Sequence, residues 1–191
     1  KSDQVMLEWL RGPEDLGNYS VAVKVIESLY FLPVILSNTF LPRLSSGSGL
    51  IKTDRELRRL YKYSWLLGVS IFLLALYILP YLIMIVFGED YDDSIIALKY
   101  LAPCGFAVST GVASAAWLNL KAGKFLKLIP LRTTVAMIVN IALNILLIPR
   151  MGIAGAALAT SISYYVATFA VTMLYSHETR LNALYLIAPF R

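Results

Sequence analysis

Polar side chains recur on one face of an apolar segment near the start of the chain. Four of them, with one apolar residue between, are spaced by four, three, four and seven residues, which places all five in one stripe along a helix. They are Ser20, Lys24, Glu27, Phe31 (an apolar member between the others) and Asn38. Because a charge facing lipid is costly, the stripe is expected to face protein or a water-filled cavity. Lys24, Glu27 and Asn38 are therefore candidates for a substrate cavity, and the alternative is an internal Lys24–Glu27 ion pair that holds the helix to a neighbour.

A second polar face lies on a later apolar segment. Thr133, Asn140 and Asn144 fall within a narrow arc of a helix, and Arg132 lies near one end of it. Asn140 and Asn144 are expected to make hydrogen bonds between helices, with a place in the substrate cavity as the alternative. A guanidinium has a planar fork that suits phosphate. Arg132 is therefore a candidate for attracting a phosphate group, and its alternative is extension toward the lipid headgroups.

The remaining titratable groups offer little further chemistry. Asp3 is a candidate for binding a coupling ion, a proton or Na⁺, whereas Glu8 is expected at the membrane surface. His177 is the only histidine, so a metal site built from several histidines is excluded. Asp92 and Asp93 are interpreted as a solvated turn, because no further acid follows at helical spacing. The chain also has no Gly-rich phosphate loop, so neither an enzyme nor an organic cofactor is expected.

Composition indicates a membrane protein. The chain is 58% hydrophobic and only 15% charged, against about 25% charged in an ordinary soluble domain. Lys and Arg number 17, and Asp and Glu number 12. Because the basic residues cluster beside apolar spans, their excess is interpreted as membrane topology and not as nucleic-acid binding. A single cysteine, Cys104, excludes a disulfide within the chain.

Apolar runs of about 20 residues predict the helices that cross a membrane. The expected fold is an all-α, polytopic transmembrane bundle of five whole helices and the end of a sixth. The partial helix covers 3–10, and the whole helices cover 17–41, 63–87, 94–120, 125–148 and 152–175. The bundle forms one domain over residues 1–175. The tail at 176–191 is too short to cross and is expected at the cytoplasmic membrane surface.

Local signals predict where helices begin and end. Residues 53–56, Thr-Asp-Arg-Glu, predict a capping box that starts a helix near Asp54. The fifth span is expected to end at Pro149, with a turn at Arg150. Proline removes a backbone hydrogen bond and can kink a helix. The prolines within or near spans are Pro33, Pro80, Pro103 and Pro130.

Charges outside the spans orient the bundle. One set of loops carries most of the Lys and Arg, whereas the other carries only Arg11 and Arg150 beside an acidic turn. The basic set comprises Arg43, Lys52, Arg55, Arg58, Arg59, Lys62, Lys121, Lys124, Lys127, Arg180 and Arg191. Basic loops remain in the cytoplasm. Ser48, in a flexible Ser/Gly linker at 45–49, is therefore expected inside, and Asp92 outside.

Small residues recur at every fourth position in three places. The sets are Ala107, Gly111 and Ala115; Gly152, Ala156 and Thr160; and Gly155, Ala159 and Ser163. Such faces let helix backbones approach closely. All three are interpreted as packing surfaces and not as ligand sites.

The stretch LNILLIPRMGIAGAALAT at 143–160 resembles the late helices of Wzx-type polysaccharide flippases, in the multidrug/oligosaccharidyl-lipid/polysaccharide exporter superfamily. The family pattern is Asn-x-x-x-Asn, Ile-Pro, a basic or aromatic residue, and Gly-Ile-x-Gly-Ala-Ala-x-Ala-Thr. Its residues here are Asn140, Asn144, Ile148, Pro149, Arg150, Gly152, Ile153, Gly155, Ala156, Ala157, Ala159 and Thr160. Residues 2–22 are similar to the end of the seventh and the start of the eighth helix of that family, and the Phe-Gly-Glu-x-Tyr turn at 87–91 also fits.

The resemblance implies export of an oligosaccharide linked to undecaprenyl diphosphate across the bacterial inner membrane, by alternating access at a midplane cavity. It implies two six-helix bundles, of which this chain would be most of the second. The implied partners are the lipid-linked oligosaccharide, the lipid bilayer and an N-terminal six-helix bundle of the same protein. A multidrug or lipid II exporter of the same superfamily is the alternative, and a membrane enzyme is a distant third.

Overall fold

The computed structural model describes residues 2–45, 50–125, 127–187 and 189, and its regular elements over these residues are all helices. Among them, five helices are long and apolar enough to cross a membrane. They cover Pro13–Leu44, Asp54–Tyr77, Asp92–Leu120, Leu128–Met151 and Ile153–Tyr175. A short helix, α1 (Ser2–Arg11), precedes them. The predicted all-α bundle with five membrane-length helices is confirmed.

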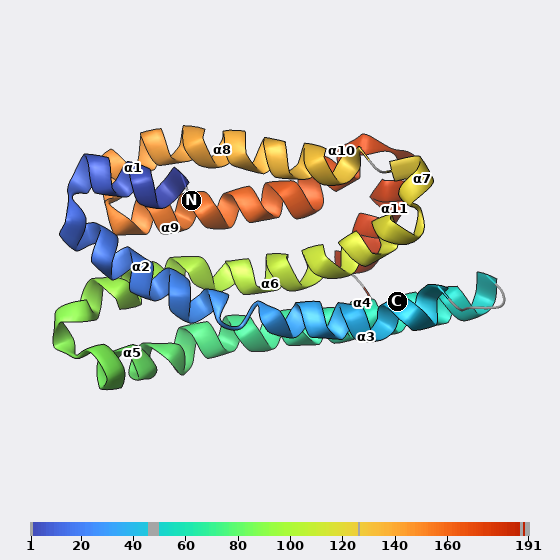
Figure 1. Cartoon of the computed structure of the whole chain (residues 1–191), viewed down its shortest axis with the longest axis horizontal. Coiled ribbons are helices and arrows are strands. Elements are labelled where there is room, and N and C mark those ends of the chain that lie inside the picture. The colour runs from blue at the N-terminus through green and yellow to red at the C-terminus, as the bar shows by residue number, and fades with distance from the viewer. Residues whose placement is uncertain (1, 46–49, 126, 188, 190–191) are drawn as a thin grey trace.

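The helices run roughly along one axis in two layers (Figure 1). One layer contains α1, α8 (Leu128–Met151) and α9 (Ile153–Tyr165). The other contains α2 (Pro13–Glu27), α3 (Phe31–Ser45), α4 (Leu50–Tyr77), α5 (Leu79–Phe87) and α6 (Asp92–Leu120). The central helix is α6, which packs against α2, α3 and α4 in its own layer and against α9 in the other.

The run at 17–41 predicts one continuous helix, but the first span, Pro13–Leu44, is interrupted. A turn at 28–30 separates α2 from α3. Proline has no N–H, so Pro33 cannot donate the helical hydrogen bond to the Leu29 carbonyl. That carbonyl accepts the N–H of Leu32 instead, at 3.2 Å. The chain therefore tightens just before Pro33, and Tyr30 lies at the break.

The predicted start of a helix at Asp54 is wrong. Helix α4 begins at Leu50, so Thr53 lies inside the helix and residues 53–56 do not cap its start. The acidic side chains of this segment pair within the helix instead. Asp54 lies 3.9 Å from Arg58, and Glu56 lies 2.7 Å from Arg59.

The predicted helix end at Pro149 is also wrong, by two residues. Helix α8 continues to Met151, and the chain turns at Gly152, whose φ of 56° favours glycine. A proline in a last helical turn removes only the N–H that would bind one carbonyl of the preceding turn. The hairpin between α8 and α9 therefore depends on Gly152 and not on Arg150.

The basic and acidic loops lie at opposite ends of the bundle. The short helix α7 (Ala122–Phe125), with Lys124, lies at the end opposite α5 and the acidic turn η1 (Glu89–Tyr91) that follows it (Figure 1). This arrangement matches the predicted division of charge between two membrane sides. Ser48 and the rest of the linker at 46–49 lie outside the described residues.

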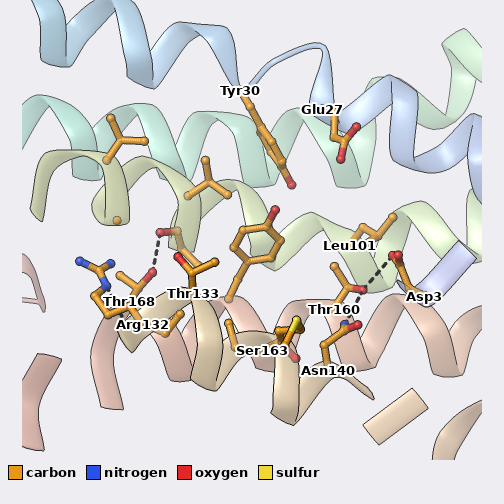
Figure 2. A pocket seen from close by; sticks show the side chains of 18 of the residues that line it. Asp3, Glu27, Tyr30, Leu101, Arg132, Thr133, Asn140, Thr160, Ser163 and Thr168 are labelled. Carbon is orange, nitrogen blue, oxygen red and sulfur yellow. Dashed lines mark hydrogen bonds between the residues drawn. The ribbon is translucent and has the colours of Figure 1, made fainter. Parts of the chain in front are cut away.

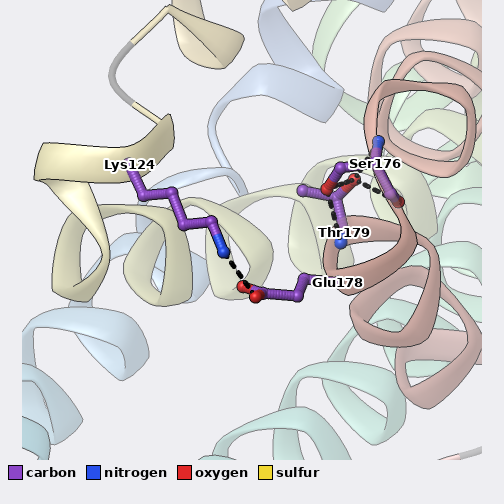
Figure 3. Close-up of polar contacts among 4 residues, drawn as sticks. All are labelled: Lys124, Ser176, Glu178 and Thr179. Carbon is purple, nitrogen blue, oxygen red and sulfur yellow. Dashed lines mark hydrogen bonds and ion pairs between the residues drawn. The ribbon is translucent and has the colours of Figure 1, made fainter.

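The tail forms a helix, α11 (His177–Ile187), that packs into the bundle on one face. Ser176 and Thr179 cap its start: each backbone N–H donates to the other's side-chain oxygen, at 3.0 and 3.2 Å (Figure 3). Lys124 Nζ donates to Glu178 Oε1 at 2.5 Å, and this hydrogen bond holds the pKa of Glu178 below its usual range. The surface tail that the sequence predicts thus has a buried face as well.

Gly155 supplies the closest approach between α8 and α9. A Cβ at this position would lie 2.4 Å from the Leu147 carbonyl oxygen. Gly155→Ala is expected to destabilise the protein by about 1–3 kcal/mol, because backbone must move to admit the methyl group. The measurement is the thermal unfolding midpoint in detergent. The matched control is Gly17→Ala in α2, where nothing lies within 4 Å of the added Cβ; it is expected to be neutral or stabilising by up to about 1 kcal/mol. Equal midpoints for the two variants would contradict this account of the hairpin.

Candidate functional site

A cavity of about 820 Å³ lies between the two layers. Its wall comes from α1, α2, α6, α8, α9 and the π-helical turn η2 (Val166–Ala170) that follows α9. Most of the wall is apolar. The polar lining residues are Ser2, Asp3, Glu27, Tyr30, Arg132, Thr133, Asn140, Thr160, Ser163, Tyr164 and Thr168. In Figure 2, Asp3, Asn140 and Thr160 lie at one end of the cavity, and Arg132 and Thr168 lie at the other.

Arg132 brings a buried positive charge to one end of the cavity. Its side chain is only 9% exposed. Its Nε donates to the Ala167 carbonyl at 3.0 Å, and its Nη1 donates to Ser114 Oγ at 3.4 Å. Both partners are neutral, and no carboxylate pairs with Arg132 among the residues that the structure describes. The charge is therefore held by dipoles alone.

The π-helical turn explains why the Ala167 carbonyl is free to bind Arg132. In an α-helix the N–H of Val171 would donate to Ala167, four residues earlier. Here it donates to Val166, five residues earlier. The wider turn leaves the Ala167 carbonyl to accept the guanidinium. A local irregularity of one helix thus provides an anchor for a charge on another.

The other end of the cavity holds a network centred on Asp3. Tyr19 donates its hydroxyl to Asp3 Oδ2 at 2.6 Å, and Thr160 Oγ1 donates to the same oxygen at 3.3 Å. Asn140 Nδ2 donates to Thr160 Oγ1 at 3.2 Å. Residues of α1, α2, α8 and α9 therefore meet at one carboxylate.

Two asparagines extend this network. Asn140 Oδ1 accepts from Ser2 Oγ at 3.2 Å and from Asn144 Nδ2 at 2.9 Å. Asn140 thus bonds to two other helices, as the sequence predicts. For Asn144 the prediction is wrong, since its amide bonds to Asn140 of the same helix, α8. Asn144 is fully buried behind Asn140, and its Oδ1 has no hydrogen-bond partner among the described residues. A buried oxygen without a donor indicates a place for a water molecule or a cation.

Tyr30 projects between the two polar groups (Figure 2). It lies at the break that Pro33 creates, so the end of α2 no longer constrains its direction to the face of one continuous helix. Tyr164 of α9 also lines the cavity. Two tyrosines on different layers give the middle of the cavity aromatic faces and hydroxyl groups.

The structure brings four of the expected site residues to the cavity wall, namely Asp3, Glu27, Arg132 and Asn140. It does not bring Lys24, Asn38 or Asn144 there: the first two side chains are exposed outside the cavity, and Asn144 is buried behind its wall. For Asn38 the reason is the break at 28–30, which changes the register between α2 and α3. Lys24 lies before the break, and the face of α2 that lines the cavity is formed by Val23, Ile26 and Glu27. Any role of Lys24 or Asn38 in binding stays a prediction.

The small-residue set Ala107, Gly111 and Ala115 lines the cavity. The interpretation of this set as a packing surface alone is therefore wrong. Gly111 lines the cavity and also allows close packing, since a Cβ there would lie 2.9 Å from Thr168 Oγ1. The sequence analysis did not identify Tyr164 as a cavity residue, because in an apolar helix a tyrosine cannot be distinguished from an ordinary packing residue.

No protein-family model, no curated protein and no solved structure matches the chain. Interpretation of the site therefore depends on its own geometry and chemistry.

The cavity should be reachable from water in the assembled protein. Thr133 and Ile138 are both exposed on α8, but only Thr133 lines the cavity. In a Cys104→Ala background, Thr133→Cys is expected to react at least tenfold faster than Ile138→Cys with a water-soluble thiol reagent in membranes, because the reactive thiolate forms in water and not in lipid. Equal rates would mean that the cavity is dry or that Ile138 does not face lipid.

Proposed function

We propose that this chain is part of a membrane transporter that moves an oligosaccharide linked to undecaprenyl diphosphate across the bacterial inner membrane, for synthesis of a cell-surface polysaccharide. The observation that carries the proposal is the cavity within membrane-length helices, with a buried guanidinium that has no carboxylate partner among the described residues. Polar groups placed inside a membrane bundle mark substrate or ion pathways.

The chemistry of Arg132 suits a diphosphate. Its hydrogen bonds to Ala167 and Ser114 use Nε and Nη1, so among the described residues Nη2 is left for a ligand. Gly111 lies beside this group, since a Cβ there would be in van der Waals contact with Nη2 at 3.6 Å, and both residues line the cavity. An anion that pairs with this charge in a low-dielectric site gains more than it would in water.

The middle of the cavity suits a sugar. Tyr30 and Tyr164 offer aromatic faces together with hydroxyl groups, and Thr133 and Ser163 add small polar contacts. Amphipathic side chains of this kind match a ligand that has both apolar and hydrogen-bonding surfaces. In this proposal an N-terminal bundle provides the opposite wall, and the two bundles open alternately to each side of the membrane.

The Asp3 network is the proposed coupling-ion site. Oxygen atoms of Asp3, Asn140 and Thr160 line one end of the cavity. The Asn144 oxygen, buried behind Asn140, lacks a donor in the described residues. Hard cations prefer oxygen ligands, and a lone carboxylate can also carry a proton. The coupling ion is therefore Na⁺ or a proton.

Replacement of Arg132 is expected to impair transport. In the full-length protein, Arg132→Ala should lower flippase activity by at least tenfold, because a hydrogen bond to a charged group contributes about 1.5–3 kcal/mol, and Arg132→Lys should keep part of the activity. The assay is complementation of a flippase-deficient strain, with protein level measured alongside. Arg150→Ala is the matched control, since Arg150 is exposed at the other end of α8. Normal activity of a well-expressed Arg132→Ala protein overturns the substrate assignment, and complementation only of lipid II or drug export supports the alternative exporters.

Replacement of Asp3 should remove ion coupling. If Na⁺ binds, NaCl is expected to raise the thermal midpoint of the purified chain above that in KCl, and Asp3→Asn should abolish the difference. Glu8→Gln, at an exposed position of the same helix, is the control. If a proton binds, transport by the full-length protein should follow the pH gradient and lose that dependence in Asp3→Asn. Independence of both Na⁺ and pH gradient contradicts the coupling site.

A further inference from the structure

A chain of buried hydrogen bonds connects Arg132 to the C-terminal helix. Arg132 Nη1 donates to Ser114 Oγ at 3.4 Å, and the Ser114 hydroxyl donates to Asn182 Oδ1 at 3.3 Å. Asn182 Nδ2 in turn donates to the Tyr61 hydroxyl. Ser114, Asn182 and Tyr61 are all at most 4% exposed. The donors run in one direction, away from the guanidinium, so each bond polarises the next.

Helix α11 carries the key member of this chain. It packs against α4 and α6 of one layer and against α10 (Val171–Tyr175), which continues the other (Figure 1). It thus bridges the two layers at the end of the bundle where Arg132 lies. Thr179, Ala183 and Leu186 share the buried face with Asn182.

The outer contacts of α11 are weak by comparison. The Lys124–Glu178 pair is on the surface, and Arg58 lies over the Tyr185 ring at 5.3 Å from an exposed position. Exposed pairs of this kind contribute little to stability. A buried asparagine, by contrast, is costly unless its amide is hydrogen-bonded. Docked α11 satisfies that amide through Ser114 and Tyr61, and undocking breaks both bonds together.

We propose that Asn182 is a positioning residue for Arg132, so that docking of α11 sets the affinity of the cavity for an anion. This inference rests on the proposed function, in which Arg132 meets a diphosphate. With α11 docked, the Ser114 proton points to Asn182 and the hydroxyl oxygen faces Nη1. Without Asn182 that hydroxyl rotates freely, and Arg132 keeps only its bond to Ala167 as a fixed anchor.

The coupling must act in both directions. If docked α11 favours anion binding, a bound anion favours docked α11 by the same factor. Occupancy of the cavity and closure of the bundle at the α11 end are then two measures of one equilibrium. The basic loops predict that this end of the bundle, where α11 docks, faces the cytoplasm.

The test uses the purified 191-residue chain in detergent and inorganic pyrophosphate as the probe. Asn182→Ala is expected to raise the dissociation constant for pyrophosphate by about fivefold to tenfold, the effect of one hydrogen bond that orients a charged group. Asn119→Ala, an exposed asparagine on α6, is the matched control and should leave binding unchanged. In the wild-type chain, pyrophosphate should slow hydrogen exchange of the α11 amides at 180–187 by a similar factor.

A double-variant cycle separates positioning from general destabilisation. In an Arg132→Ala background, where pyrophosphate binding is already lost, Asn182→Ala should change binding no further, and pyrophosphate should no longer slow exchange in α11. Ser114→Ala should match Asn182→Ala, whereas Ser114→Thr, which keeps the hydroxyl, should retain more of the affinity.

The outcomes distinguish the inference from the proposed function. Unchanged pyrophosphate binding in Arg132→Ala overturns the assignment of Arg132 to a diphosphate. Loss of binding in Arg132→Ala with full binding in Asn182→Ala overturns the positioning role and leaves that assignment intact. If Asn182→Ala does not fold, the exchange measurement in the wild-type chain decides, and unchanged exchange of α11 on binding overturns the inference.

Discussion

Arg132 carries a charge into a bundle of apolar helices, and in the part of the chain that the structure describes no carboxylate pairs with it. The burial of this charge constrains the structure around it. Removing a guanidinium from water is costly unless its N–H groups find acceptors. Here the acceptors are a backbone carbonyl and a serine hydroxyl, Ala167 and Ser114. Neutral acceptors hold the side chain in place but leave its charge uncompensated. A carboxylate paired with Arg132 would neutralise this charge and weaken its attraction for an anion.

One of the two acceptors, the Ala167 carbonyl, is available because its helix is irregular. The π-helical turn at Val166–Ala170 frees the Ala167 carbonyl, and the break at 28–30 places Tyr30 at the cavity. In a bilayer, backbone groups released from a helix must be satisfied within the protein or along a cavity. Irregular turns in membrane-length helices are therefore expected beside binding sites, and both of these turns adjoin the same cavity. The cost of disturbing each helix is offset by the contact that the disturbance allows.

The sequence alone predicts the membrane-length helices, but it predicts the residues of the cavity only in part. Apolar length alone predicts the five spans, because nothing shorter crosses a bilayer. The polar residues Asp3, Arg132 and Asn140 were found because polar groups within an apolar run require an explanation. Asn38 is placed on the cavity face only if the helix is continuous, and the break before Pro33 ends that continuity. Lys24 lies before the break, beside the face of α2 that Val23, Ile26 and Glu27 turn toward the cavity. The motif at 53–56 does not mark the start of α4, because Asp54 and Glu56 pair with Arg58 and Arg59 inside a helix that already begins at Leu50. The π-helical turn and the docking of α11 arise from contacts between distant segments, which no local pattern reports.

Helix α8 supplies residues to both ends of the cavity. It carries Arg132 at one end and Asn140 at the other. Eight residues separate them, or about 12 Å along a helix. The two groups bind opposite charges in the proposed mechanism, yet they belong to one rigid element that packs on α9 through Gly155. A shift of α8 relative to α9 would change the Asn140–Thr160 bond at one end and the Arg132–Ala167 bond at the other together. Cation and anion would then influence each other through the position of a single helix, and no direct contact between the two sites is needed.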